Sequence, residues 1–212
     1  MIKNLIVLWL LSFLLTDCSN SYLRQSTSVS NIKKKYDKVL VVAHTKDKVA
    51  RIRAEGLVVN ELGLRGVNAE SSVDVINTEK ISEEMSEKEI ETLISQLLDG
   101  GFTGVLITNV INTEQYKEVI RGGSKVEYQA PQYGRFGQYY NYYPATSWEP
   151  DRIETGVDFT VESCLYDITV AQDKNLQWIG RFKLKNPADI KEAIAQYSKE
   201  LTDALIDQSI NP

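Results

Sequence analysis

Between residues 36 and 110, short apolar runs alternate with stripes at helical spacing. Residues 38–44 read Lys-Val-Leu-Val-Val-Ala-His, a nearly continuous apolar run that is typical of a strand covered on both faces. Thr45 can cap a helix that Gly63 and Gly66 end. The apolar positions of this helix recur at steps of three and four, and they are Ala50, Ala54, Leu57, Val58 and Leu62.

The next stretch repeats this alternation. We expect a second strand over residues 67–76 and a third over 102–110. Between them, Ser86 and Glu89 form a capping box that opens a helix. Gly100-Gly101 ends that helix after an inward stripe of Ile90, Leu93, Ile94, Leu97 and Leu98. The first half therefore predicts β-α-β-α-β with short right-handed crossovers.

The second half predicts antiparallel strands and a last helix. Residues 153–171 form a long strand with a bulge near Tyr166-Asp167, and residues 176–184 alternate as in a half-exposed strand near an edge. Asn186 caps and Pro187 starts the last helix, whose stripe comprises Ile190, Ala193, Ile194, Tyr197, Leu201, Ala204 and Leu205. The expected fold is α/β with an α+β tendency in the second half. Its order is β-α-β-α-β-β-β-α, a single mixed sheet of about five strands covered by three helices.

The two halves are joined by an aromatic loop, residues 128–148. It holds eight of the nineteen aromatic residues, and its glycines and prolines disfavour regular structure. Tyrosine combines apolar area with a polar tip, which suits a binding surface; a loop packed on its own sheet is the alternative. The candidate binding residues are Tyr133, Tyr139, Tyr140, Tyr142, Tyr143 and Trp148.

The N-terminus has the pattern of a lipoprotein signal peptide. Lys3 precedes an apolar stretch of eleven residues from Leu5 to Leu15, too short to span a bilayer as a helix. Leu15-Thr16-Asp17-Cys18 resembles a bacterial lipobox, although Asp17 stands where Gly, Ala or Ser is usual. We expect residues 1–17 to be a signal peptide and Cys18 to be lipidated. The alternatives are a plain secretory signal cleaved nearby and a short N-terminal membrane-associated helix.

The serine- and lysine-rich segment that follows predicts a flexible tether over residues 18–35, with the domain at 36–212. No acidic residue follows Cys18 in this segment, which favours a periplasmic domain over surface display. We expect a lipid anchor in the bacterial cell envelope, with the outer membrane favoured. Lipidated Cys18 leaves Cys164 as the one free thiol, which we expect to be buried and inert.

Composition offers little chemistry. The net charge of −5 gives no attraction to nucleic acid, and one His with two Cys predicts neither a metal site nor a cofactor. His44 ends a strand without triad partners and is read as structural. Arg51 and Glu55 predict a surface salt bridge, and Glu149 with Asp151 is a loop carboxylate pair that sequence leaves open as glycosidase-like.

Several motifs, in their order along the chain, resemble those of a group of uncharacterised bacterial lipoproteins. They include residues 38–42, the strand Gly101 to Thr108, the Tyr/Gly-rich loop from Gly134 to Tyr143, and Leu165-Tyr166-Asp167 followed by Trp178. The likeness covers residues 36–206; Ala54 replaces the usual aromatic residue on the first helix. The resemblance implies a lipoprotein but supplies no activity. The strand and helix order is also similar to that of small periplasmic domains that assist secretion-channel assembly or activate cell-wall synthases.

Two hypotheses follow from these patterns. The first is a non-catalytic envelope lipoprotein that binds an envelope protein or a cell-wall polymer through the aromatic loop and the sheet edge. The second is an envelope hydrolase or lipid-modifying enzyme that uses loop carboxylates or His44. Nucleic acid is not an expected partner of either.

Overall fold

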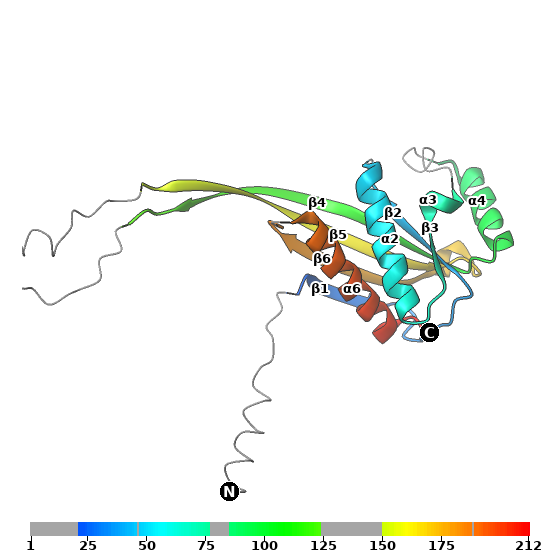
Figure 1. Ribbon diagram of the computed structural model, residues 1–212. Helices are drawn as coiled ribbons and strands as arrows, with labels where there is room; N and C mark the ends of the chain where they lie inside the picture. The colour runs from blue at the N-terminus through cyan, green and yellow to red at the C-terminus, as the bar shows by residue number, and fades with distance from the viewer. Residues whose placement is uncertain (1–20, 46, 77–84, 124–149, 188) are drawn as a thin grey trace, which may run out of the picture.

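One mixed sheet organises the chain (Figure 1). The computed structural model describes residues 21–45, 47–76, 85–123, 150–187 and 189–212. Within them, six strands lie in the order β1-β6-β5-β4-β2-β3. The strands are β1 Leu23–Ser28, β2 Val39–His44, β3 Ala69–Ser71, β4 Gly104–Ile120, β5 Arg152–Asp167 and β6 Leu176–Lys185. The helices are α2 Lys48–Leu64, α3 Ser72–Val75, α4 Glu87–Asp99 and α6 Ile190–Gln208, with a 3-10 turn η3 at Gln172–Lys174. The expected α/β class is confirmed.

The sheet joins a parallel part to an antiparallel part. β2 runs parallel to β3 and β4, whereas the pairs β4–β5, β5–β6 and β6–β1 are antiparallel. The bulge expected near Tyr166-Asp167 is present as a register shift between Leu165 and Tyr166. A second shift lies between Val110 and Asn112 of β4.

β2 explains why its sequence is apolar throughout. Val39 and Val41 face a core that α2 and α6 cover, while Leu40 and Val42 face a second core under α4. Both faces of the strand are therefore buried, as the continuous apolar run predicts. Figure 1 shows α2 and α6 together on one side of the sheet and α4 on the other.

The strand expected over residues 67–76 is wrong beyond its centre. β3 ends at Ser71, and residues 72–75 form the short helix α3. The Ser71 hydroxyl accepts a hydrogen bond from the Val73 backbone N–H, which is a helix N-cap contact. A capping serine therefore ends the strand even though the following residues are apolar.

The interior of α2 corrects two predictions. The helix buries Arg51, Glu55, Val58 and Leu62. Glu55 is 0% exposed, so the expected surface salt bridge between Arg51 and Glu55 is wrong. Of the predicted stripe, only Val58 and Leu62 are fully buried. Glu55 lies in the core beside them, because a carboxylate that accepts hydrogen bonds from several backbone and hydroxyl donors is stable there.

The Glu55 carboxylate joins three elements. It accepts hydrogen bonds from the Ala43 N–H of β2 at 2.8 Å and from the Ser71 and Ser72 hydroxyls at 2.6 and 2.7 Å. The Val73 N–H donates to it at 3.3 Å. One side chain of α2 thus fixes the end of β2, the end of β3 and the start of α3.

Two helix starts differ from the prediction. Asp47, not Thr45, caps α2, because its carboxylate accepts from the Val49 and Ala50 N–H groups. Asp189, not Asn186, caps α6 in the same way, so Pro187 precedes the helix. In both cases a carboxylate closer to the first turn replaces the predicted cap. The capping box of α4 and its end at Gly100 are confirmed.

The flexible tether expected over residues 18–35 is wrong for its described part. Residues 23–28 form β1, which pairs with β6 at the edge of the sheet. The hydroxyl of Ser26 accepts from the Gln208 side chain of α6 at 2.8 Å. Polar residues suffice here because backbone hydrogen bonds hold an edge strand and half of its surface stays in water.

α6 packs on the sheet and is joined to it by hydrogen bonds between buried hydroxyl groups. The Tyr197 hydroxyl lies 2.6 Å from the Ser163 hydroxyl and 3.0 Å from that of Thr108, and these two strand residues are direct partners. The Tyr197 ring meets Phe182 edge-on, with ring centroids 5.0 Å apart. Burial raises the pKa of Tyr197 to about 12, so the phenol stays protonated in the folded protein at neutral pH.

We expect Glu55→Ala to lower the free energy of unfolding by about 3 kcal/mol, because it leaves several buried donors without an acceptor. Asn60→Ala, at an exposed position of the same helix, is the control and changes stability by less than about 0.5 kcal/mol. Urea unfolding followed by circular dichroism measures both. Equal midpoints for the two variants would contradict the role given to Glu55.

Candidate binding surface

The most prominent surface is a two-stranded arm that leaves the sheet (Figure 1). We define the arm as residues 110–120 of β4 with their partners 152–161 of β5. At about 3.4 Å per residue, the arm extends roughly 34 Å beyond Val110. Figure 1 shows it reaching far past the helices, and the expected third strand over 102–110 is thus only the beginning of β4.

The edges of the arm are open over most of its length. β2 pairs with β4 only as far as His44 opposite Asn109, and β6 pairs with β5 only from Asp158 onward. Among the described residues, no strand pairs with either edge beyond these points. Unpaired N–H and C=O groups on a strand edge are a template for a further strand.

The two faces of the arm differ in chemistry. On one face, Val119 pairs directly with Ile153, and the two are 58% and 66% exposed. The same face of β5 continues through Thr155 and Val157 to Phe159, which packs against the core under α2 and α6. The partners of Thr155 and Val157 on β4 are Lys117 and Gln115, so the apolar side chains of this face lie at its two ends and on β5. We call it the apolar face; such exposed apolar pairs on a projecting ribbon are typical of interaction surfaces.

The opposite face is acidic. Glu118 lies directly opposite Glu154, and Glu114 lies directly opposite Asp158. The Lys183 ammonium group of β6 bridges the second pair, at 3.0 Å from Glu114 and 3.4 Å from Asp158. These hydrogen bonds raise the pKa of Lys183. Like charges opposite each other weaken a strand pair, and the Arg152 guanidinium group, 3.4 Å from the Glu154 carboxylate, offsets part of this repulsion.

A glycine shapes the middle of the acidic face. Gly156 is the partner of Tyr116, and a Cβ atom at position 156 would collide with the Tyr116 ring. The ring therefore lies across the glycine backbone, which is a known way of protecting a glycine in a strand. Tyr116 remains 39% exposed and is the one described aromatic residue of β4.

The predicted binding residues of the aromatic loop lie outside the described residues. These are Tyr133, Tyr139, Tyr140, Tyr142, Tyr143 and Trp148, and Glu149 of the carboxylate pair lies there as well. The described residues on either side of the loop meet at the far end of the arm, where Ile120 and Arg152 are partners. There the Asp151 carboxylate accepts the Gly122 N–H at 2.8 Å, which gives Asp151 a local structural role.

His44 and Cys164 are both accessible to some degree. His44 is exposed at the end of β2, and its Nδ1 lies 2.8 Å from the Asn109 side-chain oxygen on β4. Cys164 is half-buried, not fully buried as expected. Burial and the neighbouring Glu162 charge raise the pKa of its thiol, which disfavours the reactive thiolate.

The segment before β1 is also held in place. Glu200 of α6 accepts hydrogen bonds from the Ser21 hydroxyl at 3.0 Å and from the Tyr22 and Leu23 N–H groups at 2.8 and 2.9 Å. The Tyr22 carbonyl accepts from the Lys183 N–H at 2.8 Å. The chain is thus fixed from Ser21, three residues after Cys18.

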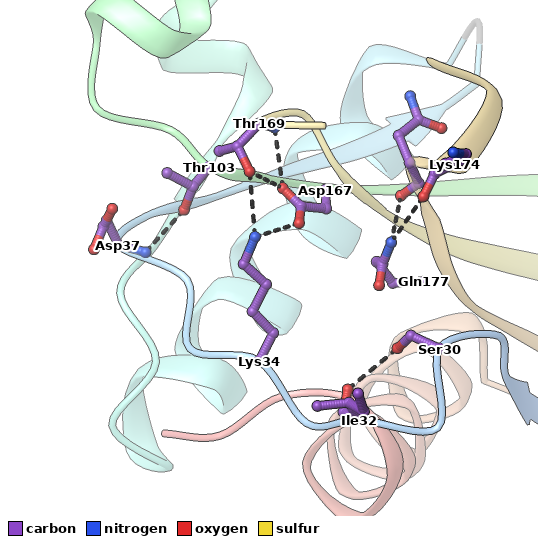
Figure 2. A network of polar contacts seen from close by, with 10 residues as sticks. Ser30, Ile32, Lys34, Asp37, Thr103, Asp167, Thr169, Lys174 and Gln177 are labelled. Atoms are coloured by element: carbon purple, nitrogen blue, oxygen red, sulfur yellow. Dashed lines mark hydrogen bonds and ion pairs between the residues drawn. The ribbon is translucent and has the colours of Figure 1, made fainter. Parts of the chain in front are cut away.

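A second set of contacts fixes the chain after β1 (Figure 2). Lys34 forms an ion pair with Asp167, at the end of β5, and its ammonium group also donates to the Thr169 hydroxyl. Burial acts to raise the pKa of Asp167, but the hydrogen bonds from Lys34 and Thr169 outweigh it and hold that pKa below its usual range. The Lys34 backbone is hydrogen-bonded to Ser209 and Asn211.

Two other features are absent from the described part of the chain. No group of three or more His, Cys, Asp and Glu side chains there could hold a metal ion. None of the described helices has the length and apolar character needed to cross a membrane.

Sequence reasoning missed the arm and the Glu200 contacts. Residues 113–120 mix strand-forming Thr, Tyr, Val and Ile with charged residues, so neither face shows a continuous apolar signal. Glu200 looks like any exposed helix carboxylate until α6 is placed beside β1. The length of β5 was the usable signal, because an antiparallel strand of that length needs an equally long partner.

Comparison with known proteins shows little. No protein-family model and no curated protein matches the chain. Among solved structures, two PelC dodecamers from Paraburkholderia phytofirmans, one of them a variant, have TM-scores of 0.44 and 0.43. They are 12% and 11% identical, with 85% and 88% of this chain and 96% and 97% of PelC covered. A PDZ domain protein from Parabacteroides distasonis has a TM-score of 0.34 at 10% identity, with 87% of this chain and 35% of that protein covered. At TM-scores below 0.5, these likenesses do not bear on function.

We expect Lys34→Met to lower the free energy of unfolding at pH 7 by about 1 kcal/mol, because it leaves the buried Asp167 carboxylate without its cation. The native pKa of Asp167 is depressed, so its contribution is present above about pH 4 and is lost as the pH falls below that. Lys34→Met should reduce this acid-side loss, whereas Lys35→Met, at an exposed position, should keep it. Denaturant unfolding between pH 3 and pH 7 measures both slopes, and identical slopes would contradict the assignment.

Proposed function

We propose that this chain is a non-catalytic lipoprotein of the bacterial cell envelope, a binding or assembly module anchored through lipidated Cys18. The domain faces the periplasm, and the outer membrane is the favoured site of the anchor. The partner is an envelope protein or a cell-wall polymer. The contact surface for this partner is the aromatic loop, residues 128–148, together with the free strand edges of the arm.

The projecting arm is the observation that carries this proposal. A ribbon that reaches beyond its own core gains little burial there, and its exposed Val110 and Ile111 side chains stay in contact with water. Its free edges can also accept a strand from a partner. These features suit a protein that is completed by binding.

The sequence supports the anchor. An apolar stretch of eleven residues followed by a lipobox-like Leu-Thr-Asp-Cys has the order of a lipoprotein signal. The likeness of residues 36–206 to bacterial lipoproteins points the same way. Acyl chains contribute about 0.8 kcal/mol per buried CH₂, which suffices for stable anchoring when several are attached.

We expect Cys18→Ala to release the protein from the membrane fraction, because the acyl chains then have no attachment site. Wild-type protein should resist extraction with high salt and dissolve in detergent. Immunoblots of membrane and periplasmic fractions measure the distribution, with Cys164→Ala as the matched cysteine control. Retention of the Cys18→Ala protein in salt-washed membranes would contradict the lipid anchor.

We expect the loop and the arm to be required for partner capture. Deletion of residues 133–143 should leave the circular dichroism spectrum unchanged and abolish co-purification of a crosslinked partner. Ile111→Lys, on the exposed arm, should weaken capture, whereas Val170→Lys, at an exposed position beyond the opposite end of β5, should not.

The pull-down uses intact cells and mild crosslinking before detergent extraction. A partner must be enriched over the Cys18→Ala protein to count. If wild-type protein captures nothing above that control, the binding function is wrong.

A further inference from the structure

We infer that the arm lies along the surface of the lipid bilayer and that its apolar face, at Val119 and Ile153, contacts the lipid. This inference rests on the proposed lipid anchor at Cys18 and adds the orientation of the domain to it. It follows from where the chain is first held, from the register of the sheet, and from the chemistry of the two faces of the arm.

The proposed lipid anchor limits the distance between the domain and the bilayer. Two residues, Ser19 and Asn20, separate Cys18 from Ser21, whose hydroxyl is held by Glu200. A fully extended chain can span at most about 11 Å between the Cα atoms of Cys18 and Ser21. The bilayer surface therefore lies close to the start of β1.

The register of the sheet places the arm at the same end. One row of paired residues crosses four strands, from β1 to β4: Leu23, Phe182, Val161 and Val110. β4 continues from this row toward the arm, and the chain before β1 enters from that same direction because β1 and β4 are oppositely oriented. The arm thus begins level with the first residue of β1 and extends about 34 Å past it.

The two faces decide which side of the arm meets the lipid. The apolar face is continuous along β5 with the side of the sheet that α6 covers, and Glu200 of α6 holds the N-terminal segment on that side. The acidic face carries Glu114, Glu118, Glu154 and Asp158 against Arg152 and Lys183, so its net charge is negative and anionic lipid headgroups would repel it. Contact through Val119 and Ile153 transfers apolar area out of water and keeps the carboxylates away from the headgroups.

Site-specific photocrosslinking tests this orientation. The photoreactive residue p-benzoylphenylalanine replaces Val119 or Ile153 in the full lipidated protein, reconstituted in vesicles of phosphatidylethanolamine and phosphatidylglycerol. Two control proteins carry it elsewhere. One has it at Val170, an exposed valine beyond the end of β5 that is opposite to the arm, and the other has it at Glu118, on the acidic face. Mass spectrometry counts lipid adducts per protein. We expect several-fold more adducts at positions 119 and 153 than at either control.

Three results would overturn the inference: equal adduct yields at all positions, a higher yield at Val170, or adducts to protein instead of lipid at positions 119 and 153. Glu200→Ala is then added to the protein that carries the photoreactive residue at position 119. It removes the contacts of Glu200 with residues 21–23, which lengthens the segment between Cys18 and the sheet, and it should reduce the yield of lipid adducts. Glu192→Ala, at an exposed position of the same helix, should leave it unchanged.

The same sample separates the inference from the proposed function. Mass spectrometry of the N-terminal peptide shows whether Cys18 bears acyl chains; an unmodified Cys18 contradicts the anchor itself. In that case, protein that begins at Cys18 and carries Cys164→Ser is coupled to a maleimide lipid in the same vesicles. High yields at positions 119 and 153 then support the orientation alone, and equal yields at all four positions overturn it.

Discussion

The pairing of β4 with β5 is the contact on which the rest of the molecule depends. It runs from Gly104 opposite Asp167 to Ile120 opposite Arg152. Its first part joins the parallel strands to the antiparallel ones, and its last part is the arm. The other strands pair outward from β4 or from β5. The same hydrogen-bond ladder therefore joins the two parts of the core and forms the projecting arm.

Buried polar groups organise both ends of the sheet around that pair. At one end, Glu55 ties α2 to β2, β3 and α3. At the other end of the parallel strands, Lys34 and Asp167 tie the segment after β1 to the last residue of β5. Such contacts add little net free energy compared with apolar packing, but they penalise any arrangement that leaves a charge unpaired. They specify one docking geometry for segments that have few apolar residues.

Much of the fold could be predicted because burial leaves a periodic signal. β2 is buried on both faces and reads as an apolar run, and β6 alternates because one face of it is open. The sequence predicts α2 as a helix with Val58 and Leu62 inward but misses the burial of Arg51 and Glu55, since periodicity treats charged residues as surface residues. β1 was missed because an edge strand needs only backbone partners, which composition does not reveal. The arm was missed for the same reason: it buries little, so no hydrophobic pattern marks it. The arm could not be predicted because it is formed by strand partners that lie far apart in the sequence.

The attachment of the N-terminal segment to α6 has a consequence for the order of folding. Tyr22 and Glu200 are 178 positions apart, so their contact cannot form until almost the entire chain has been synthesised. Contacts of such sequence separation close late, because the entropy of a long loop opposes them. The segment from Ser21 to Leu23 therefore stays accessible while the rest of the chain is made. On the proposed lipidation of Cys18, the modifying enzyme would therefore act before β1 pairs with β6.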